Sequence, residues 1–469
     1  MARKNAYFES QGIATVGIIF DRFTFDFHSS ARAVGLSEIR AVEVPYAYTG
    51  LSVEAVTAEV ATHIDEIIKA LTTPLKGKVN NPEELLTEKI TTQAGYQTTW
   101  GKVELGPIEK DVITFTGNTY DEAFELFQKK FLDWGWGDGF PLVPPNRERV
   151  DAMLSGTSHN PDEVLTDTFH PGGGIATVEK IAIQAVMAGA RPEYFPVILA
   201  ATQCMIDAGE RFIIAAQSTS PHTPFYWING PIIKEIGVNY GIGTLGPGAQ
   251  SRVNIAIGRS SRLVMMNVGG AYLGVKDMDT IGCATKFGLV TAEDEDDLIA
   301  LDWKPYHVTM GFKPTDSTIS MVTIEDRVNI VGMSTGSAEG LLLYFAACMG
   351  QKMGVEWQFG PGSSAIVLLS GDDAHMCVNQ GWKTKESISL FLAKHIKVDR
   401  EVFFTYFSSQ AKEWCQEEDM LARYPEGDIY AGDQAAKGIT ILRAGGFAGK
   451  DDFYRGGGRP IPVSIDKWR

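Results

Sequence analysis

Apolar positions in the first 72 residues recur in blocks that predict alternating strands and helices. The runs "IATVGIIF" and "IRAVEVPY" have the length of strands, and "FDFHSSARAVG" between them has a helical pattern that closes at Gly35. The segment "SVEAVTAEVATHIDEIIKAL" carries apolar residues at three- and four-residue spacing, with Ser52 as its natural N-cap, which predicts a long amphipathic helix. This strand–helix–strand–helix order predicts a small parallel α/β layer.

A polar, irregular stretch separates this module from a larger region. Residues 76–115 have little apolar periodicity and are predicted to be a linker. Beyond them, strand-like and helix-like runs such as "YDEAFELFQKKFLDWGW" alternate with glycine-rich loops, and no repeat of fixed period is visible. The sequence thus predicts an α/β protein: a small parallel module over 1–75 and a larger mixed α/β domain with the active site over 116–469. The C-terminal "YRGGGRPIPVSIDKWR" is predicted to be a loose tail.

Composition narrows the class of protein. A chain of 469 residues is too long for one ordinary core, and 44% apolar with 21% charged residues is the profile of a well-packed soluble protein. The net charge of −16 argues against nucleic acid or an anionic membrane as a partner, because both need a basic surface. No apolar run has the length of a membrane span, and no apolar segment follows "MARKNAYFES" as in a signal peptide. We therefore expect a cytoplasmic protein.

Cysteine usage agrees with a reducing compartment. The cysteines are odd in number and far apart, and no CxxC pair occurs, so we expect free thiols rather than disulfides or a zinc–cysteine site. The five are Cys204, Cys283, Cys348, Cys377 and Cys415.

Residues 13–74 resemble the UGSC-like family, small proteins of which some carry selenocysteine. The resemblance lies in "SSARAVGL", "IRAVEVPY" and "LSVEAVTAEVATHIDEIIKALTTP". In that family a segment with cysteine or selenocysteine precedes the first strand and implies redox chemistry. Here the preceding "MARKNAYFESQG" contains no cysteine, so the reactive position has no counterpart. The resemblance therefore implies a scaffold or interaction module rather than a redox centre.

A second resemblance covers residues from about 134 to 390. This region is similar to bacterial proteins through "DGFPLVPP", "GGGIATVEKIAIQAVMAG", "NIAIGRSSRLVMMNVGGA", "DMDTIG" and "AHMCVNQGW". It implies no catalytic residue, so the chemistry has to be inferred from the residues themselves.

The stretch "FHPGGGIATVEKIAIQAVMAG" is the first candidate site. Gly172, Gly173 and Gly174 expose backbone N–H groups and run directly into an apolar helix, whose positive N-terminal end suits an anion. A tight structural turn is the alternative. Glu179 and Lys180 are predicted to line the same site, as a catalytic base and a substrate contact. Their alternative is charge pairing that makes burial of the helix tolerable.

Three histidines in loop-like surroundings are further candidates for proton transfer. They are His170 beside the glycines, His307 in "KPYHVTMG" and His375 in "GDDAHMC". No HExxH motif and no helical pair at i, i+4 occurs, so the sequence contains no local zinc motif. Asn229 in "FYWINGP" and Asn267 in "NVGGAYLG" are predicted substrate contacts. A structural role is the alternative for each.

The acid-rich stretch "DMDTIGCATKFGLVTAEDEDD" offers oxygen ligands. Asp279 and Glu293 lie on either side of a strand-like run, and separated carboxylates can bind a divalent metal ion or divide acid and base roles. A solvated acidic face is the alternative, since dense acidic runs commonly have that role.

Together these features predict an enzyme that uses acid–base chemistry, hydrolysis or elimination, on a small polar and anionic substrate. Glu179 or His307 is the expected base, His170 or His375 its partner, and residues 172–174 the anion anchor. The cofactor is open: a divalent metal ion is one option, and a nucleotide is not expected because no nucleotide fingerprint occurs. We also expect a homo-oligomer.

Two other functions remain open. One is a non-catalytic subunit of a thiol or selenol redox complex, in which the UGSC-like module docks a partner that retains the reactive residue. The other is thiol redox catalysis by Cys204 or Cys283, which lack a resolving cysteine nearby in the sequence.

Overall fold

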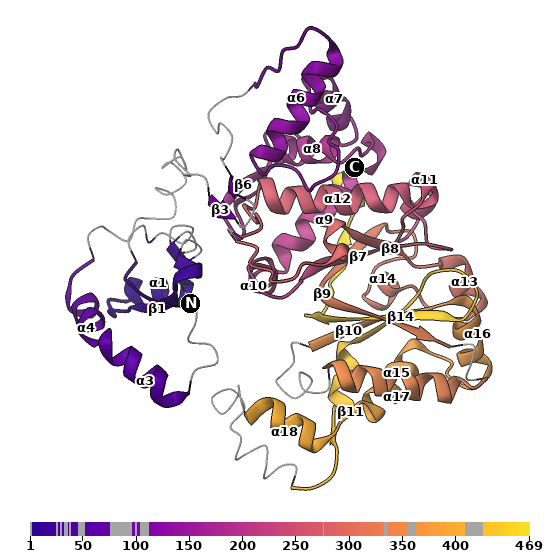
Figure 1. Ribbon diagram of the computed structural model, residues 1–469. Helices are drawn as coiled ribbons and strands as arrows, with labels where there is room; N and C mark the ends of the chain where they lie inside the picture. The colour runs from indigo at the N-terminus through magenta and orange to yellow at the C-terminus, as the bar shows by residue number, and fades with distance from the viewer. Residues whose placement is uncertain are drawn as a thin grey trace. The chain divides into compact units, whose positions relative to one another are not determined.

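The computed structural model describes residues 2–24, 27–28, 31, 36, 39–45, 52–75, 96–98, 101–103, 112–274, 276–332, 336–353, 363–408 and 425–469. These form two compact units (Figure 1). The first unit contains residues 1–144, 164–177 and 263–278, and the second contains 145–163, 178–262 and 279–469. Most of the expected linker over 76–115, part of the expected helix at 25–35, and Cys415 lie outside the described residues.

The N-terminal part of the first unit contains the parallel layer that the sequence predicts. Strand β1 (Gly17–Phe20) pairs with β2 (Ala41–Val44) in parallel. The Ser52 side chain accepts a hydrogen bond of 3.3 Å from Ala55 N and caps α3 (Val53–Thr62). The predicted long helix is divided at His63, after which α4 (Ile64–Thr72) begins. The structure also describes helix α1 (Ala2–Ser10) and η1 (Asp21–Phe23) in this part.

Elsewhere in the first unit the structure describes helix α6 (Tyr120–Asp133), the C-terminal end of α12 (Arg252–Asn267) and two hairpins. Helix α6 buries Phe127 and Phe131, as its apolar spacing predicts. One hairpin joins β3 (Tyr96–Thr98) to β4 (Gly101–Val103), and the other joins β5 (Val164–Phe169) to β6 (Gly174–Thr177).

The second unit is built on a mixed sheet of seven strands in the order β13-β10-β14-β9-β7-β8, with β15 paired to β9 (Figure 1). The strands are β7 (Thr223–Asn229), β8 (Leu289–Ala292), β9 (Thr318–Val331), β10 (Ser363–Leu369), β13 (Ile439–Arg443), β14 (Lys450–Gly457) and β15 (Val463–Ser464). A parallel layer and a larger mixed sheet confirm the predicted α/β class.

The two halves of this sheet have the same topology. In one half β7 and β8 are parallel and β9 is antiparallel to β7; in the other β10 and β13 are parallel and β14 is antiparallel to β10. The antiparallel pair β9 and β14 joins the halves. A shared topology with different connecting segments leaves no fixed sequence period, which explains why none is visible.

Each face of the sheet is buried. Ala365, Val367 and Leu369 of β10 pack with α15 (Ala338–Met353) and α17 (Lys385–His395), which lie together on one side (Figure 1). The alternate residues Ile366 and Leu368 pack instead with side chains from β7, β8, β9, β13 and β14. This period-two alternation is what a strand buried on both faces requires.

The other helices connect or cover these strands. They are α7 (Arg147–Leu154), α8 (Val178–Met187), η3 (Pro192–Tyr194), α9 (Phe195–Asp207), α10 (Glu210–Ala216), α11 (Ile232–Ile236), η4 (Ala249–Ser251), α12 (Arg252–Asn267), η5 (Ala284–Phe287), α13 (Glu295–Ala300), α14 (Tyr306–Thr309), α16 (Gly371–Asn379), α18 (Arg400–Ser408), η7 (Asp433–Gly438) and η8 (Asp466–Trp468). A small ladder pairs β11 (Lys397–Val398) with β12 (Ile429–Tyr430). No helix in the described ranges is long and apolar enough to cross a membrane.

The expected loose C-terminal tail is wrong. Residues 450–457 form β14, which lies between β9 and β10 in the sheet, and Trp468 near the chain end is buried. The strand was hidden because it carries two acids and two glycines, whose burial depends on long-range pairing rather than on local apolar pattern.

Candidate functional site

Residues 293–297 follow β8 and place five acidic side chains at the carboxyl end of two parallel strands. Glu293 comes directly after β8, and Asp294 caps α13 by accepting a 3.1 Å hydrogen bond from Asp297 N. Acids at the N-terminus of a helix are favoured by the exposed N–H groups there. The carboxyl ends of parallel strands are also where α/β proteins commonly bind ligands.

Glu293 is fully buried and its charge is compensated. The Lys385 ammonium pairs with Oε1, while Asn229 Nδ2 and Tyr306 N donate to Oε2 at 2.9 and 2.6 Å. A buried carboxylate with one ion pair and two further donors meets the usual conditions for burial of a charge. Glu293 is therefore a group that holds its neighbours in position.

Asn229 is held in one orientation by two carboxylates. Its Nδ2 donates to Glu293 Oε2 at 2.9 Å and to Glu295 Oε1 at 3.0 Å. A flipped amide would place its oxygen against both carboxylates, so the hydrogen bonds fix the assignment. The Asn229 side chain is fully buried, yet Oδ1 has no hydrogen-bond partner in the described part of the chain.

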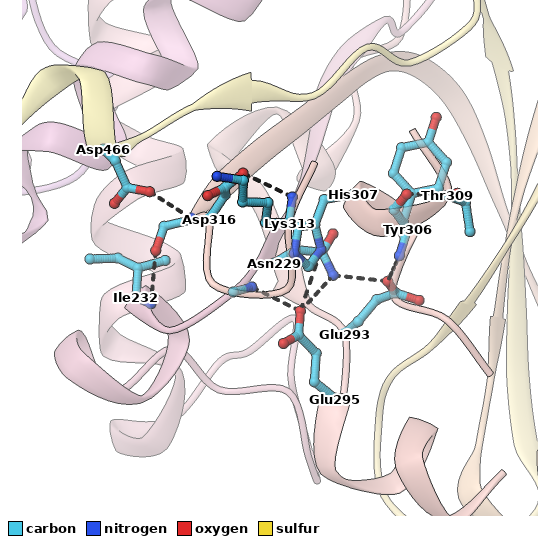
Figure 2. Close-up of polar contacts among 12 residues, drawn as sticks. Asn229, Ile232, Glu293, Glu295, Tyr306, His307, Thr309, Lys313, Asp316 and Asp466 are labelled. Atoms are coloured by element: carbon cyan, nitrogen blue, oxygen red, sulfur yellow. Dashed lines mark hydrogen bonds and ion pairs between the residues drawn. The ribbon is translucent and has the colours of Figure 1, made fainter. Parts of the chain in front are cut away.

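Glu295 connects Asn229 with His307 (Figure 2). Its Oε1 accepts from Gly230 N at 2.8 Å and lies 3.8 Å from His307 Nδ1. His307, on the short helix α14, is 0% exposed, whereas the Glu295 side chain is 24% exposed. Neither ring nitrogen of His307 has a hydrogen-bond partner among the described residues. An imidazole buried in this way is unusual, because buried polar groups are nearly always hydrogen-bonded.

A second histidine joins the same acidic segment through Asp297. His375 Nε2 lies 2.8 Å from Asp297 Oδ1, and Arg443 Nε donates to Oδ2 at 2.5 Å. Burial alone would raise the pKa of Asp297, but the hydrogen bonds from His375 and Arg443 outweigh it, and the pKa is lowered. Asp297 therefore stays ionised beside His375, whose side chain is 37% exposed.

The structure thus brings four of the predicted site residues into one network around residues 293–297. Asn229 touches Glu293 directly, while His307 and His375 join through Glu295 and Asp297. The network also contains four residues that were not among the predicted site residues: Glu295, Asp297, Lys385 and Arg443. Glu295 and Asp297 stand in the conspicuous "EDEDD" run, but Lys385 and Arg443 reach the segment from 92 and 146 residues away and carry no local signal.

The three glycines have a structural explanation. They form the turn between β5 and β6, so the expectation that they lead directly into a helix is wrong: β6 intervenes before α8 begins at Val178. Gly173 has φ +83°, and a Cβ at Gly174 would lie 2.1 Å from Val268 O. Gly172 N and Gly173 N donate to Gly269 O and Phe169 O at 2.6 and 2.9 Å, so these two amides are engaged within the protein.

The remaining predicted residues have other surroundings. His170 and Asn267 belong to the first unit, where Asn267 Nδ2 donates to Trp136 O at 3.0 Å. In the second unit, Glu179 pairs with Arg147 at 2.5 Å, and desolvation by the surrounding protein lowers the pKa of Lys180. None of these contacts includes a residue of the 293–297 segment, so the roles of these residues stay predictions.

The predicted metal ligands lie in separate contacts. Asp279 Oδ2 is 2.7 Å from Lys286 Nζ, and Glu293 is paired with Lys385. Across the ranges that the structure describes, no group of three or more His, Cys, Asp or Glu side chains is arranged to hold a metal ion.

A pair of buried carboxyl groups lies at the ends of β10 and β14. Asp451 Oδ1 accepts from Ser370 N at 2.7 Å, Ser370 Oγ donates to Asp373 Oδ2 at 3.3 Å, and both acids are at most 2% exposed. Burial, a hydrogen bond with Asp373 and the repulsion between the two carboxyls raise the pKa of Asp451 to about 8. The pair therefore holds a shared proton at neutral pH.

Comparison with known proteins identifies only the N-terminal part. Residues 2–73 match the UGSC family, which confirms the resemblance of this module. Neither the curated proteins nor the solved structures that were compared gave a match to the chain.

Proposed function

We propose that this protein is an enzyme that transfers a proton to and from a small polar substrate through His307, with Glu295 as the residue that positions it. The observation that carries the proposal is the fully buried imidazole with two unpartnered nitrogens, 3.8 Å from a partly exposed carboxylate. A structural histidine would be expected to have its nitrogens satisfied by the fold.

The chemistry follows from ordinary acid–base catalysis. In hydrolysis, His307 takes a proton from water as the water oxygen bonds to a carbonyl carbon, and returns it to the leaving group as that bond breaks. In elimination, it takes the proton from a C–H bond whose electron pair becomes the new double bond, and the departing group carries the proton away. Both reactions need His307, so a substitution of this residue cannot distinguish them. The products formed from different classes of substrate can.

The short helix that carries His307 has to move before a substrate can reach the ring. Helix α14 is four residues long and lies in the connection between α13 and β9. Connections of this kind open more easily than the sheet beneath them. Glu295, whose side chain is 24% exposed, marks the solvent side of the site.

The proposal is tested by a turnover screen. Small esters, amides, hydroxy acids and amines are incubated with the protein in D2O, and NMR records hydrolysis, elimination or deuterium uptake at carbon. His307→Gln is expected to lower turnover by roughly 10²–10⁴-fold, the usual contribution of a general base. His63→Gln, at the exposed junction of α3 and α4, is the matched control and should retain activity. Equal turnover in the two variants refutes the assignment.

A second candidate function concerns the UGSC-family module. The module contains no cysteine, and the apolar stripe Ile64, Ile68 and Leu71 on α4 is between 39% and 53% exposed, which favours a docking role with a thiol or selenol redox protein. Co-purification with such a protein that is lost in Ile68→Asp, but kept in Glu59→Lys, supports this function. Retention of the partner by both variants argues against it.

We further propose a cytoplasmic location and a homo-oligomeric state. Four cysteines, Cys204, Cys283, Cys348 and Cys377, are free thiols, as in a reducing compartment. Light scattering of the purified protein gives the molar mass directly, and a value near the 51.2 kDa of one chain refutes the oligomer.

A further inference from the structure

We infer that the ligand of the Glu295–His307 site is a small organic cation, such as an ammonium, amidinium or guanidinium compound, held by Glu295 and Asn229 Oδ1. This ligand class rests on the proposed function and deepens it. It differs from the anionic substrate that the glycine stretch suggests.

The orientation of Asn229 supplies the first reason. Because Nδ2 is committed to Glu293 Oε2 and Glu295 Oε1, the buried Oδ1 can only accept a hydrogen bond. A buried acceptor without a partner has lost its hydrogen bonds to water without compensation, which is a cost to the folded protein. A ligand that donates an N–H to this oxygen removes that cost, whereas a carboxylate has no proton to donate at neutral pH.

The charges of the segment supply the second reason. Lys385 is paired with Glu293, Arg443 with Asp297 and Asp294, and Lys234 with Asp296. No lysine or arginine of the described ranges lies within ion-pair distance of Glu295. Lys234, which pairs with Asp296, senses Glu295 only as a longer-range charge, so Glu295 has no ion-pair partner among the described lysines and arginines.

Glu295 also has an oxygen available to a ligand. Oε1 takes the hydrogen bonds from Asn229 Nδ2 and Gly230 N and faces His307 Nδ1. Oε2 has no partner within the described residues, and the side chain is partly exposed. An N–H group can therefore approach Glu295 Oε2 from solvent, and a cation there is attracted by the full charge of a partly desolvated carboxylate.

An anion at the same place meets the opposite conditions. It would lie near the carboxylates of Glu293 and Glu295, while the neighbouring cations Lys385 and Arg443 are already engaged. Like charges at short range in a partly buried site raise the free energy of binding. The geometry thus discriminates between ligand classes by charge as well as by hydrogen bonding.

Binding of defined probes tests this ligand class. The full chain is titrated by calorimetry with methylammonium, acetamidine and methylguanidine, and separately with acetate and methyl phosphate, at equal ionic strength. Glu295→Gln removes the charge and keeps the shape. Asp296→Asn removes a charge one residue away, where Asp296 is exposed and paired with Lys234, and is the matched control.

We expect at least one cation to bind saturably, about tenfold or more weaker in Glu295→Gln and unchanged in Asp296→Asn. Saturable binding of an anion that depends on Glu295 overturns the inference, as does equal cation affinity in the two variants or no binding of any probe. If a neutral or anionic compound is turned over and this turnover depends on His307, only the inferred ligand class is contradicted. If a cation binds through Glu295 but no turnover depends on His307, only the proposed function is contradicted.

Discussion

Replacing Asp451 by asparagine should stabilise the protein at neutral and alkaline pH and flatten the pH dependence of its stability. Asp451 and Asp373 are buried together, and the pKa of Asp451 is raised from 3.8 to about 8, first by burial and then by the hydrogen bond and charge of Asp373. An asparagine at 451 can accept from Ser370 N and donate to Asp373, so it reproduces the shared proton without titrating.

The sign follows from proton linkage. Between pH 3.8 and about 8 the folded protein keeps a proton that the unfolded chain has released. The stabilisation of the folded state by this proton is therefore complete below the unfolded pKa of 3.8 and is lost as the pH rises through the folded pKa of about 8. The free energy of unfolding falls by up to about 1.4 kcal/mol per pH unit. Cys377 also faces the pair: burial first, and then the charges of Asp451 and Asp373, raise its pKa to about 12, so it stays neutral here.

Thermal unfolding from pH 5 to pH 9 measures the effect. With roughly 2 °C per kcal/mol, the lower end of the range for domains of 150–250 residues because the second unit is larger, Tm of the wild type should fall by about 3 °C per pH unit more than that of Asp451→Asn up to about pH 8. The exposed neighbour Asp372 accepts from Ala448 N and is not part of the pair, so Asp372→Asn should keep the wild-type slope. Parallel curves for wild type and Asp451→Asn refute the shared proton.

Three further outcomes are expected. His375→Gln should lower turnover less than loss of the buried histidine does, because His375 is partly exposed and acts beside Asp297; steady-state kinetics on the substrate found in the screen decides this. Gly174→Ala should lower Tm, because its Cβ would lie 2.1 Å from a backbone carbonyl, and an unchanged Tm contradicts the close approach. Lys385→Met should destabilise the fold by roughly 3–5 kcal/mol in denaturant unfolding, because it leaves Glu293 buried without its cation.

Local pattern was sufficient for much of the secondary structure. The Ser52 cap, β1, β2 and α6 follow from residues that are neighbours in the sequence, and each is present where the pattern predicts it. Strand β14 was missed because its acids and glycines are buried by partners far along the chain. Tertiary pairing of this kind overrides local propensity.

The candidate site was likewise predictable only in part from local sequence. Asn229, Glu293, His307 and His375 stand in loop-like sequence that suggests chemistry, and the structure joins them through residues 293–297. The glycine stretch suggested an anion anchor with equal force, but its turn and the close backbone at residues 268–270 explain the glycines without a ligand. Sequence indicates which residues are unusual, whereas the contacts indicate which of them act together.

A double-substitution cycle of His307 and Glu295 tests the central claim most directly. The kcat of the screened substrate is measured at saturating concentration, so that weaker binding through Glu295 does not enter the comparison, for wild type, His307→Gln, Glu295→Gln and the double variant. Residues that act as one unit are non-additive, so the double variant should be about as slow as His307→Gln alone. Losses that multiply, or full activity in His307→Gln, contradict a site in which Glu295 acts through His307.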